Sequence, residues 1–310
     1  MYRLRNMKKL FRVLLALHIA LYQFIPDLAQ AAQRFLTCNT TCTITAVDTS
    51  IWGTTTGGTG ASVPGSSDDV VLDGATCVGG TTCTATFGAG YNPTWQALTM
   101  SACTASTSGC ILDANPNTNT ITLTNSGAYT NTGAGTRTLS GGTWVLSNNA
   151  ALWTINASAT VTNNPSVSYT GTGNRRFFGG GKTYGTVSNV SGTSFIINGN
   201  NTIGTFTPSP GNSIYLNTGV NLTITTITNV TGSSSLQTLF INQDTITATV
   251  TITPTNNWTC DWCGFSNITR AGAGTITATN SFDFKGNNTG ASFTITAPSV
   301  GGGGGRIIGG

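Results

Sequence analysis

The chain from Ala32 onwards is dominated by short runs in which apolar and polar residues alternate. Thr, Ile, Val, Phe and Tyr make up these runs, and Gly, Asn or Pro bounds them, for example "TITLT" from Thr120 to Thr124. Alternation places successive side chains on opposite faces of an extended strand. No apolar pattern with helical spacing persists, and Thr, Asn, Gly and Ser are poor residues for a helix interior. The pattern predicts an almost entirely β protein.

Two of these runs recur at a nearly constant interval. The first occurs as "TYGTVSNV", "TIGTFTPS" and "TITTITNV", which begin at Thr183, Thr202 and Thr223. The second occurs as "SFIINGN", "SIYLNTG", "TLFINQD" and "SFDFKGN", which begin at Ser194, Ser213, Thr238 and Ser281. The last of these intervals is close to two repeats. We therefore expect an all-β, single-stranded parallel β-helix, or β-solenoid, with coils of about 19–25 residues.

One such coil cannot be stable alone. Roughly four or five buried apolar side chains contribute ~1.5–3 kcal/mol each, whereas ordering the backbone costs ~1–2 kcal/mol for every residue. Stacking adds hydrogen bonds to coils ~4.8 Å away and a continuous interior. Outward Thr, Ser and Asn can bond their equivalents on neighbouring coils, but repeated like charges would repel one another. This architecture accounts for the absence of charge between Thr183 and Gln243.

The segment that precedes Ala32 has the features of a secretory signal peptide. Basic residues precede an apolar run from Val13 to Ile25, and the small-residue site Ala29-Gln30-Ala31 follows it. The run is shorter than the ~20 apolar residues of a membrane-spanning helix. We expect cleavage after Ala31, an extracellular or cell-surface location and no membrane span in the mature chain. Retention as an uncleaved anchor is the alternative.

The basic residues of this segment dominate the formal charge of the chain. Five of the 13 basic residues and one of the nine acidic residues precede Ala32, so eight of each remain and the mature chain is formally neutral. Nothing in this balance indicates a nucleic-acid partner. The only histidine, His18, lies in the same segment. Catalysis by a nucleophile and histidine is therefore excluded from the mature chain.

The eight cysteines form four close couples: Cys38 with Cys42, Cys77 with Cys83, Cys103 with Cys110, and Cys260 with Cys263. An even number in an exported chain is typical of disulfides, and we favour pairing within each couple, although 105 connectivities are open to eight cysteines. A redox dithiol is the alternative for the last couple. It lacks the strand-then-helix setting that lowers the pKa of a thioredoxin-type thiol.

Six of the cysteines precede Asn115. We expect a signal peptide at 1–31, a cysteine-rich N-terminal cap with the first coils at 32–115, and the solenoid at 116–300. The Gly-rich segment 301–310 is expected to be a flexible tail.

Two segments resemble a loosely defined group of β-helix repeat proteins from bacterial surfaces and phage structural or tail-associated proteins. The first is "WGTTTGGTGASVPGSSDDVVLDGAT", from Trp52 to Thr76. The second runs from "FFGGGKTYGTVSNVSG" at Phe177 to "SFDFKGNNTGASFTI", ending at Ile295. The resemblance implies a β-helix and an extracellular or virion setting, and the group offers no catalytic residues to carry over. A signal peptide fits a surface protein better than a phage component, which assembles in the cytoplasm.

Three aspartates are candidates for a polysaccharide lyase or glycosidase site. Asp244, Asp261 and Asp283 follow one another at intervals close to one coil each. Stacked carboxylates would stand ~5 Å apart, near the separation of a retaining glycosidase pair, and Arg270 and Lys285 could neutralise a substrate carboxylate. Against this, Asp283 occupies the position that Ile196, Tyr215 and Phe240 hold in the other copies, whereas Asp244 lies four positions further along its own copy.

Two further aspartates could hold calcium. Asp69 and Asp73 are expected on one strand face with Val71 between them, and backbone carbonyls would complete such a site. A charged edge strand that discourages aggregation is the alternative. No other cofactor is expected.

The aromatic residues Trp144, Trp153, Tyr169 and Tyr184 are expected inside the coils. Tyr215 is the exception, because Ile214 and Leu216 flank it and must point to the opposite face.

The leading hypothesis is a secreted or surface-associated, non-catalytic β-solenoid that serves as a structural spacer or adhesion module for surface glycans or other extracellular polymers. A phage tail-associated structural protein, trimeric and located in the virion, is the first alternative. The polysaccharide lyase or glycosidase is the second.

Overall fold

The structure is a computed structural model. It describes residues 31–38, 40–73, 82–101, 109–114, 118–133, 135–190, 194–217, 219–228, 230–235, 237–242, 250–284 and 288–299. The contacts divide the chain into two units, Met1–Ala32 and Gln33–Gly310. Residues 1–30 of the expected signal peptide and the Gly-rich segment 301–310 lie outside the described residues, as do Cys77, Cys103, Asp244 and Lys285.

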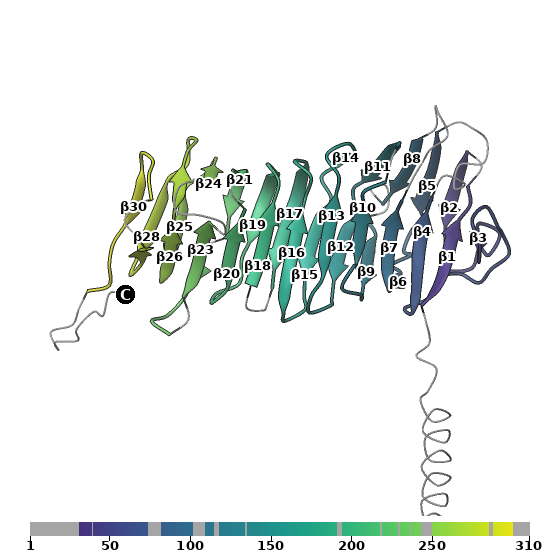
Figure 1. Cartoon of the computed structure of the whole chain (residues 1–310), viewed down its shortest axis with the longest axis horizontal. Coiled ribbons are helices and arrows are strands. Elements are labelled where there is room, and N and C mark those ends of the chain that lie inside the picture. The colour runs from purple at the N-terminus through teal and green to yellow at the C-terminus, as the bar shows by residue number, and fades with distance from the viewer. Residues whose placement is uncertain are drawn as a thin grey trace, which may run out of the picture. The chain divides into compact units, whose positions relative to one another are not determined.

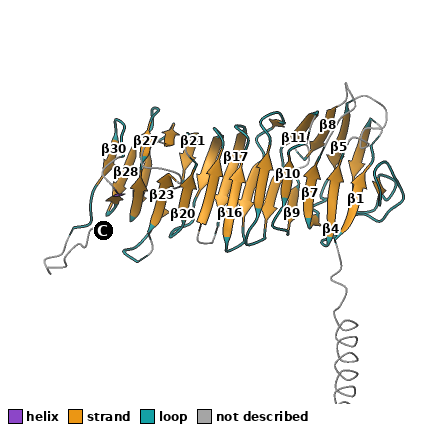
Figure 2. Ribbon diagram, viewed as in Figure 1, coloured by secondary structure: helices purple, strands orange, loops and turns teal. Residues whose placement is uncertain are grey.

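The described residues form thirty strands and no α-helix, which confirms the prediction of an all-β protein (Figure 2). Most strands belong to two long sheets. The twelve-stranded sheet contains β1 (Ala32–Leu36), β3 (Trp52–Gly53), β4 (Asp68–Leu72), β7 (Ala97–Met100), β10 (Tyr129–Asn131), β13 (Leu152–Ile155), β16 (Asn174–Phe178), β18 (Ser194–Asn198), β20 (Ser213–Leu216), β23 (Thr238–Asn242), β26 (Cys263–Ser266) and β29 (Phe282–Asp283). The nine-stranded sheet contains β6 (Thr94–Trp95), β9 (Thr120–Leu123), β12 (Thr143–Leu146), β15 (Ser166–Tyr169), β17 (Thr183–Asn189), β19 (Thr202–Thr207), β21 (Asn221–Ile227), β24 (Val250–Pro254) and β27 (Ile268–Arg270).

Two shorter sheets occupy different parts of the sequence. The five-stranded sheet contains β2 (Thr41–Ile44), β5 (Cys83–Phe87), β8 (Gly109–Asp113), β11 (Thr136–Ser140) and β14 (Thr160–Thr162). The four-stranded sheet contains β22 (Val230–Thr231), β25 (Trp258–Asp261), β28 (Ile276–Thr279) and β30 (Phe293–Ile295). Neighbouring strands with a described register are parallel, except for β1 and β3, which pair antiparallel. Within each sheet the neighbouring strands follow sequence order, except that β3 lies beyond β1 (Figure 1). Long parallel sheets of this kind are compatible with a β-solenoid.

The register between strands agrees with much of the sequence alignment. Thr183 of β17 pairs with Thr202 of β19, and Thr202 pairs with Thr223 of β21. In the twelve-stranded sheet, Ser194 pairs with Ser213. The strands paired here are therefore the ones whose sequences match.

Between β20 and β23, the next pair of strands in the twelve-stranded sheet, the register differs by one position from the alignment of the repeated runs. Ser213 pairs with Leu239 rather than Thr238, so Ile214 lies opposite Phe240. A shift of one position moves every side chain to the other face. With the predicted alignment, the inward Phe240 would stand opposite the outward Tyr215, so burial of the phenyl ring decides the register.

The interior is filled by the inward half of each strand, and aromatic rings line much of it. Trp144, Trp153 and Tyr169 are fully buried and Tyr184 is nearly so, as predicted. Tyr215 is half-buried and lies on the opposite face from the buried Ile214 and Leu216, also as predicted. None of the described residues forms a helix of the length and apolarity needed to cross a bilayer.

Candidate functional site

The outer face of the four-stranded sheet carries a shallow pocket of about 200 Å³. Four threonines, one aspartate and the edges of two inward residues line it: Val230, Thr231, Thr259, Cys260, Asp261, Thr277 and Thr279. The pocket therefore presents several hydroxyl groups around a single carboxylate.

Strand pairing explains why these side chains meet. Asp261 of β25 pairs with Thr231 on one side and Thr279 on the other, while Thr259 pairs with Thr277. Alternation along each strand turns these residues outward. The intervening Cys260 pairs with the fully buried Ala278 and points inward. The threonines were not singled out from the sequence, although the runs "TCD" and "TAT", about one coil apart, carry the signal.

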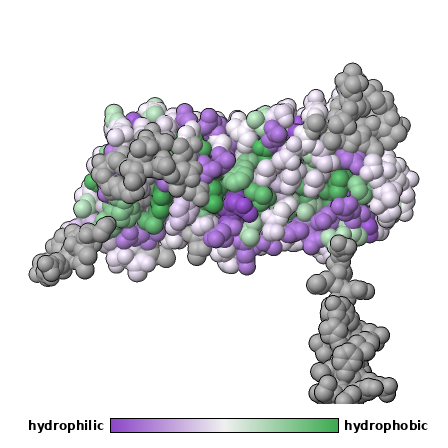
Figure 3. Space-filling model, viewed as in Figure 1, coloured by the Kyte–Doolittle hydropathy of each residue, from purple (hydrophilic) through white to green (hydrophobic). Residues whose placement is uncertain are grey.

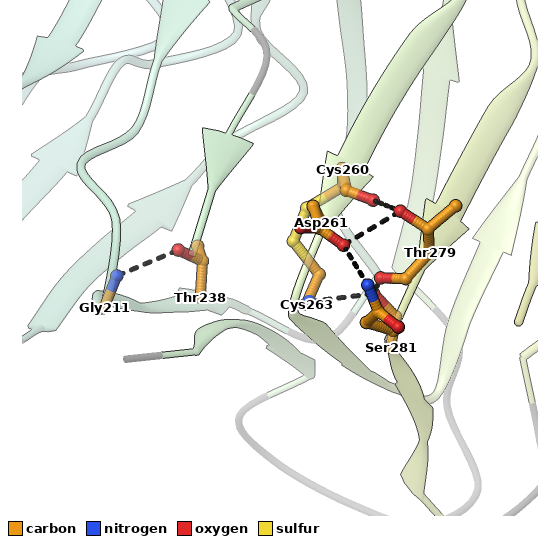
Figure 4. Close-up of a disulfide and its surroundings, with 8 residues drawn as sticks. Gly211, Thr238, Cys260, Asp261, Cys263, Thr279 and Ser281 are labelled. Atoms are coloured by element: carbon orange, nitrogen blue, oxygen red, sulfur yellow. Dashed lines mark hydrogen bonds between the residues drawn. A yellow bond between two sulfur atoms is a disulfide. The ribbon is translucent and has the colours of Figure 1, made fainter. Parts of the chain in front are cut away.

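Two neighbouring side chains fix the orientation of the Asp261 carboxylate. Its Oδ1 accepts one hydrogen bond from the Thr279 hydroxyl at 2.9 Å and another from Nδ2 of Asn280 at 2.9 Å. Figure 4 shows Asp261 and Thr279 facing each other across adjacent strands. Asn280 has a φ of 47°, a left-handed conformation that Asn adopts more readily than most residues. The carboxylate is thus held at the rim of the pocket.

A disulfide joins Cys260 to Cys263 directly behind the pocket, with the two Cα atoms 6.1 Å apart (Figure 4). It links β25 of the four-stranded sheet to β26 of the twelve-stranded sheet, and both cysteines are buried. The backbone N–H of Cys263 donates to the Ser281 hydroxyl at 2.8 Å. The disulfide therefore anchors the strand that carries Asp261.

The N-terminal cysteines are oxidised as well. Cys38 and Cys42 are joined, which is the local pairing that their spacing predicted. Cys83 and Cys110 are also disulfide-bonded, and they lie opposite each other on β5 and β8. Their predicted partners, Cys77 and Cys103, lie outside the described residues.

The candidate carboxylates of the lyase or glycosidase hypothesis lie on different sheets. Asp261 belongs to the four-stranded sheet and Asp283 to the twelve-stranded sheet, whereas Asp244 is outside the described residues. Asp283 pairs with Phe265, which pairs with Phe240, as expected from the repeat. It does not share the position of Tyr215, which lies opposite Ile241 instead. Its carboxylate accepts a hydrogen bond from Nδ2 of Asn288.

Arg270 is not available to neutralise a substrate carboxylate. The side chain is buried and donates to the carbonyl oxygens of Ala291, Gly272 and Gly274. A guanidinium engaged in this way joins two turns of the chain and is turned away from any substrate at the surface.

The calcium candidates lie on β4 and directly beyond its end. Asp69 and Val71 lie on the outer side of β4, but the strand ends at Leu72, and Asp73 beyond it accepts a hydrogen bond from the Thr56 hydroxyl at 2.8 Å. The neighbouring Asp68 is buried and lies 3.8 Å from the Arg34 guanidinium. Within the described ranges, no three His, Cys, Asp or Glu side chains gather as a metal site.

The pKa of Asp69 gives a testable pH dependence. Burial, and then the nearby Asp68 charge, raise this pKa above the ordinary value of 3.8. The folded protein therefore holds the proton to higher pH than the unfolded chain, and stability falls as pH rises through the raised pKa. We expect Asp69→Asn to be more stable than the wild type at pH 7, and the difference to vanish below pH 3.8.

Thermal unfolding of both proteins between pH 3 and pH 8 measures this effect. Asp48→Asn is the matched control, because hydrogen bonds from Ser50 lower the pKa of Asp48 and give the opposite sign. A wild type that calcium stabilises at pH 7, with the stabilisation lost in Asp69→Asn, would contradict the expectation and favour the calcium hypothesis.

None of the comparisons with known proteins identifies a relative: no family model, no curated protein and no solved structure matches the chain.

Proposed function

We propose that the chain is a secreted or surface-associated β-solenoid without catalytic activity, which acts as a spacer or adhesion module and contacts glycans through the pocket around Asp261. The cysteine-rich segment 32–115 forms its N-terminal cap. Coils of the predicted 19–25 residues fit the middle of the chain, where Ser194 pairs with Ser213 and Thr202 with Thr223. Other coils are longer than predicted, since Asp69 pairs with Ala97, 28 positions further on, and Asn221 with Thr251, 30 positions further on. The proposal rests on the order of the strands, the character of the outer faces and the chemistry of the pocket.

The order of the strands supports a coil. β7, β8 and β9 belong to the twelve-, five- and nine-stranded sheets in turn, and β10 then returns to the twelve-stranded sheet beside β7. β11 and β12 repeat the sequence of sheets one position further on. A chain that visits three sheets cyclically, advancing by one strand each time, is the path of a parallel β-helix.

The outer faces support a spacer that stays soluble without charge. Ser188 donates to Ser168 at 3.0 Å, and the hydroxyls of Thr207 and Thr228 are 3.0 Å apart, so outward hydroxyls bond between adjacent strands. Residues of intermediate hydropathy cover much of the visible face, with hydrophilic and hydrophobic ones between them (Figure 3). Hydroxyl groups on such a surface form hydrogen bonds between adjacent strands, and they do not repel one another as like charges would.

The proposal that the chain contacts glycans rests on the pocket around Asp261. Oδ1 of Asp261 is held by Thr279 and Asn280, while Thr231, Thr259 and Thr277 expose hydroxyl groups beside it. Sugar hydroxyls both donate and accept hydrogen bonds, so a fixed carboxylate among hydroxyls matches them. The pocket is smaller than the ~300–1,000 Å³ typical of drug-sized ligands. It therefore suits one unit of a longer, neutral glycan chain.

Asp261→Asn is expected to weaken binding to a neutral polysaccharide by about tenfold, because a charge-assisted hydrogen bond contributes ~1.5–3 kcal/mol. Affinity electrophoresis of the oxidised protein through gels containing single neutral polysaccharides measures the dissociation constant. Asp283→Asn is the matched control, since Asp283 lies on another sheet, and it should bind as the wild type does.

Three outcomes would count against the proposal. If no member of a broad panel of neutral polysaccharides slows the migration of the wild type, the glycan assignment is wrong. Equal loss in both variants would remove the pocket as its site. Release of oligosaccharides that Asp261→Asn abolishes would favour the lyase or glycosidase.

A further inference from the structure

Arg175 differs from the other buried arginines in how few acceptors surround it. Arg137 donates from Nε to Asn131 and from Nη2 to Ser158, and Arg270 donates to three carbonyl oxygens, so each of them leaves a single nitrogen without a partner. Arg175 is fully buried, yet only its Nη1 finds an acceptor, the carbonyl oxygen of Gly171. Its Nε and Nη2 have no partner, and no carboxylate of the described residues forms an ion pair with it.

The position of Arg175 on β16 explains why the charge is inside. Asn174 and Arg176 on either side are exposed, so alternation turns Arg175 inward, in the same direction as the buried Phe177. Its Cα neighbour on the next strand is Phe195, which is fully buried. Burial lowers the pKa of the Arg175 guanidinium, the direction expected for a cation removed from water.

Asn189, at the end of β17, is a second buried polar residue without a partner, and two intervening rings connect it to Arg175. It is fully buried, and both side-chain atoms, Oδ1 and Nδ2, lack a hydrogen-bond partner. Asn189 pairs with Tyr169 on the adjacent strand, and the Tyr169 ring lies 5.0 Å from the ring of Phe195, the neighbour of Arg175. The Tyr169 hydroxyl donates to the carbonyl oxygen of Arg176 at 2.8 Å and is thus already engaged.

This arrangement leaves N–H donors without acceptors around an uncompensated positive charge. Leaving a buried cation without a counter-charge, and its donors without acceptors, is strongly unfavourable. A water molecule would satisfy a donor, but it would not offset the charge. A dianion or an organic acid would need access from solvent, which full burial of both residues denies. A single-atom anion can be enclosed during folding and can accept hydrogen bonds from several directions.

We propose that a small monovalent anion, chloride under ordinary conditions, binds inside the protein between the Arg175 guanidinium and the Asn189 carboxamide. The Nε and Nη2 groups of Arg175 and the Nδ2 group of Asn189 donate to it. The anion neutralises the buried cation and joins β16 to the end of β17. It is a structural ligand, independent of the glycan pocket on the four-stranded sheet.

Thermal unfolding at constant ionic strength tests this site, with sodium chloride or bromide replacing sodium gluconate. A ligand that binds only the folded state raises the midpoint with the logarithm of its concentration, here by roughly 2–4 °C for each tenfold increase above the dissociation constant. We expect this slope in the wild type and its loss in Arg175→Met. Arg176→Met is the matched control, because the adjacent Arg176 is exposed, and it should keep the wild-type slope.

A second measurement does not depend on any variant folding. Crystals of the wild type grown in sodium bromide should show an anomalous-scattering peak between the side chains of Arg175 and Asn189. A solvent peak there without anomalous signal would identify water and overturn the proposal. A halide slope that is equal in the wild type and both variants would also overturn it, since it would reflect a general salt effect.

Discussion

Replacement of Trp153 by alanine is expected to lower the free energy of unfolding by about 3–5 kcal/mol, because it empties a large volume in a fully packed interior. Trp153 is fully buried, and its ring centroid lies 4.2 Å from that of Tyr129 and 5.8 Å from that of Trp144. Its indole N–H also donates to the Tyr184 hydroxyl at 3.3 Å. The cavity would interrupt the contacts between successive strands of two sheets.

Guanidinium unfolding followed by far-ultraviolet circular dichroism measures this loss. Tyr215→Ala is the matched control, since Tyr215 lies on the outer face of the same sheet, and it should cost about 1 kcal/mol or less. If the two substitutions proved equally costly, the inward position of Trp153 and the outward position of Tyr215 would both be wrong.

Replacement of Arg270 by methionine is expected to cost about 2–4 kcal/mol, because it removes a buried charged donor from three carbonyl oxygens. The guanidinium donates to Ala291 at 2.6 Å and to Gly272 at 2.7 Å, in addition to Gly274. Methionine fills a similar volume but donates nothing. The effect should be local, because these bonds join the turn after β27 to the turn before β30.

Hydrogen exchange read by mass spectrometry separates a local from a global effect. In Arg270→Met, exchange should accelerate in β28 and β30 and remain at the wild-type rate in β13 and β16. Arg176→Met, which removes an exposed arginine, should leave all four strands unchanged. If exchange accelerates equally in all four strands of Arg270→Met, Arg270 stabilises the whole fold. That result would contradict its local role at the turns after β27 and before β30.

The positions of single side chains could be predicted from the sequence where alternation is strict. The outward position of Tyr215 and the inward position of Trp153 follow from period-two patterning alone, because a strand offers only two faces. The same rule would have placed Arg175 inward, since it shares a face with Phe177. The sequence does not say whether an acid lies nearby to neutralise it, because that depends on which strands become neighbours.

The pairing of Asp261 with threonines could not be predicted from spacing. The interval from Asp261 to Asp283 is close to one coil, which led to the expectation of stacked carboxylates. The step from β25 to β28 is shorter than this interval, so Thr279 takes the place beside Asp261, and Asp283 falls on the following sheet. Because each coil contributes strands to more than one sheet, a difference of a few residues in spacing moves a side chain from one sheet to the next.

Local patterning predicts that this protein is built of strands and, where alternation is strict, which side chains each strand buries. The sequence also predicts the pairing of β17, β19 and β21, where nearly equal intervals leave a single alignment of matching residues. Three features follow from the folded arrangement alone: the pairing of Ser213 with Leu239, the threonines around Asp261 and the isolation of Arg175 from any acid of the described residues. Each of these features depends on the number of residues in the turns between strands, and the packing of the interior fixes that number.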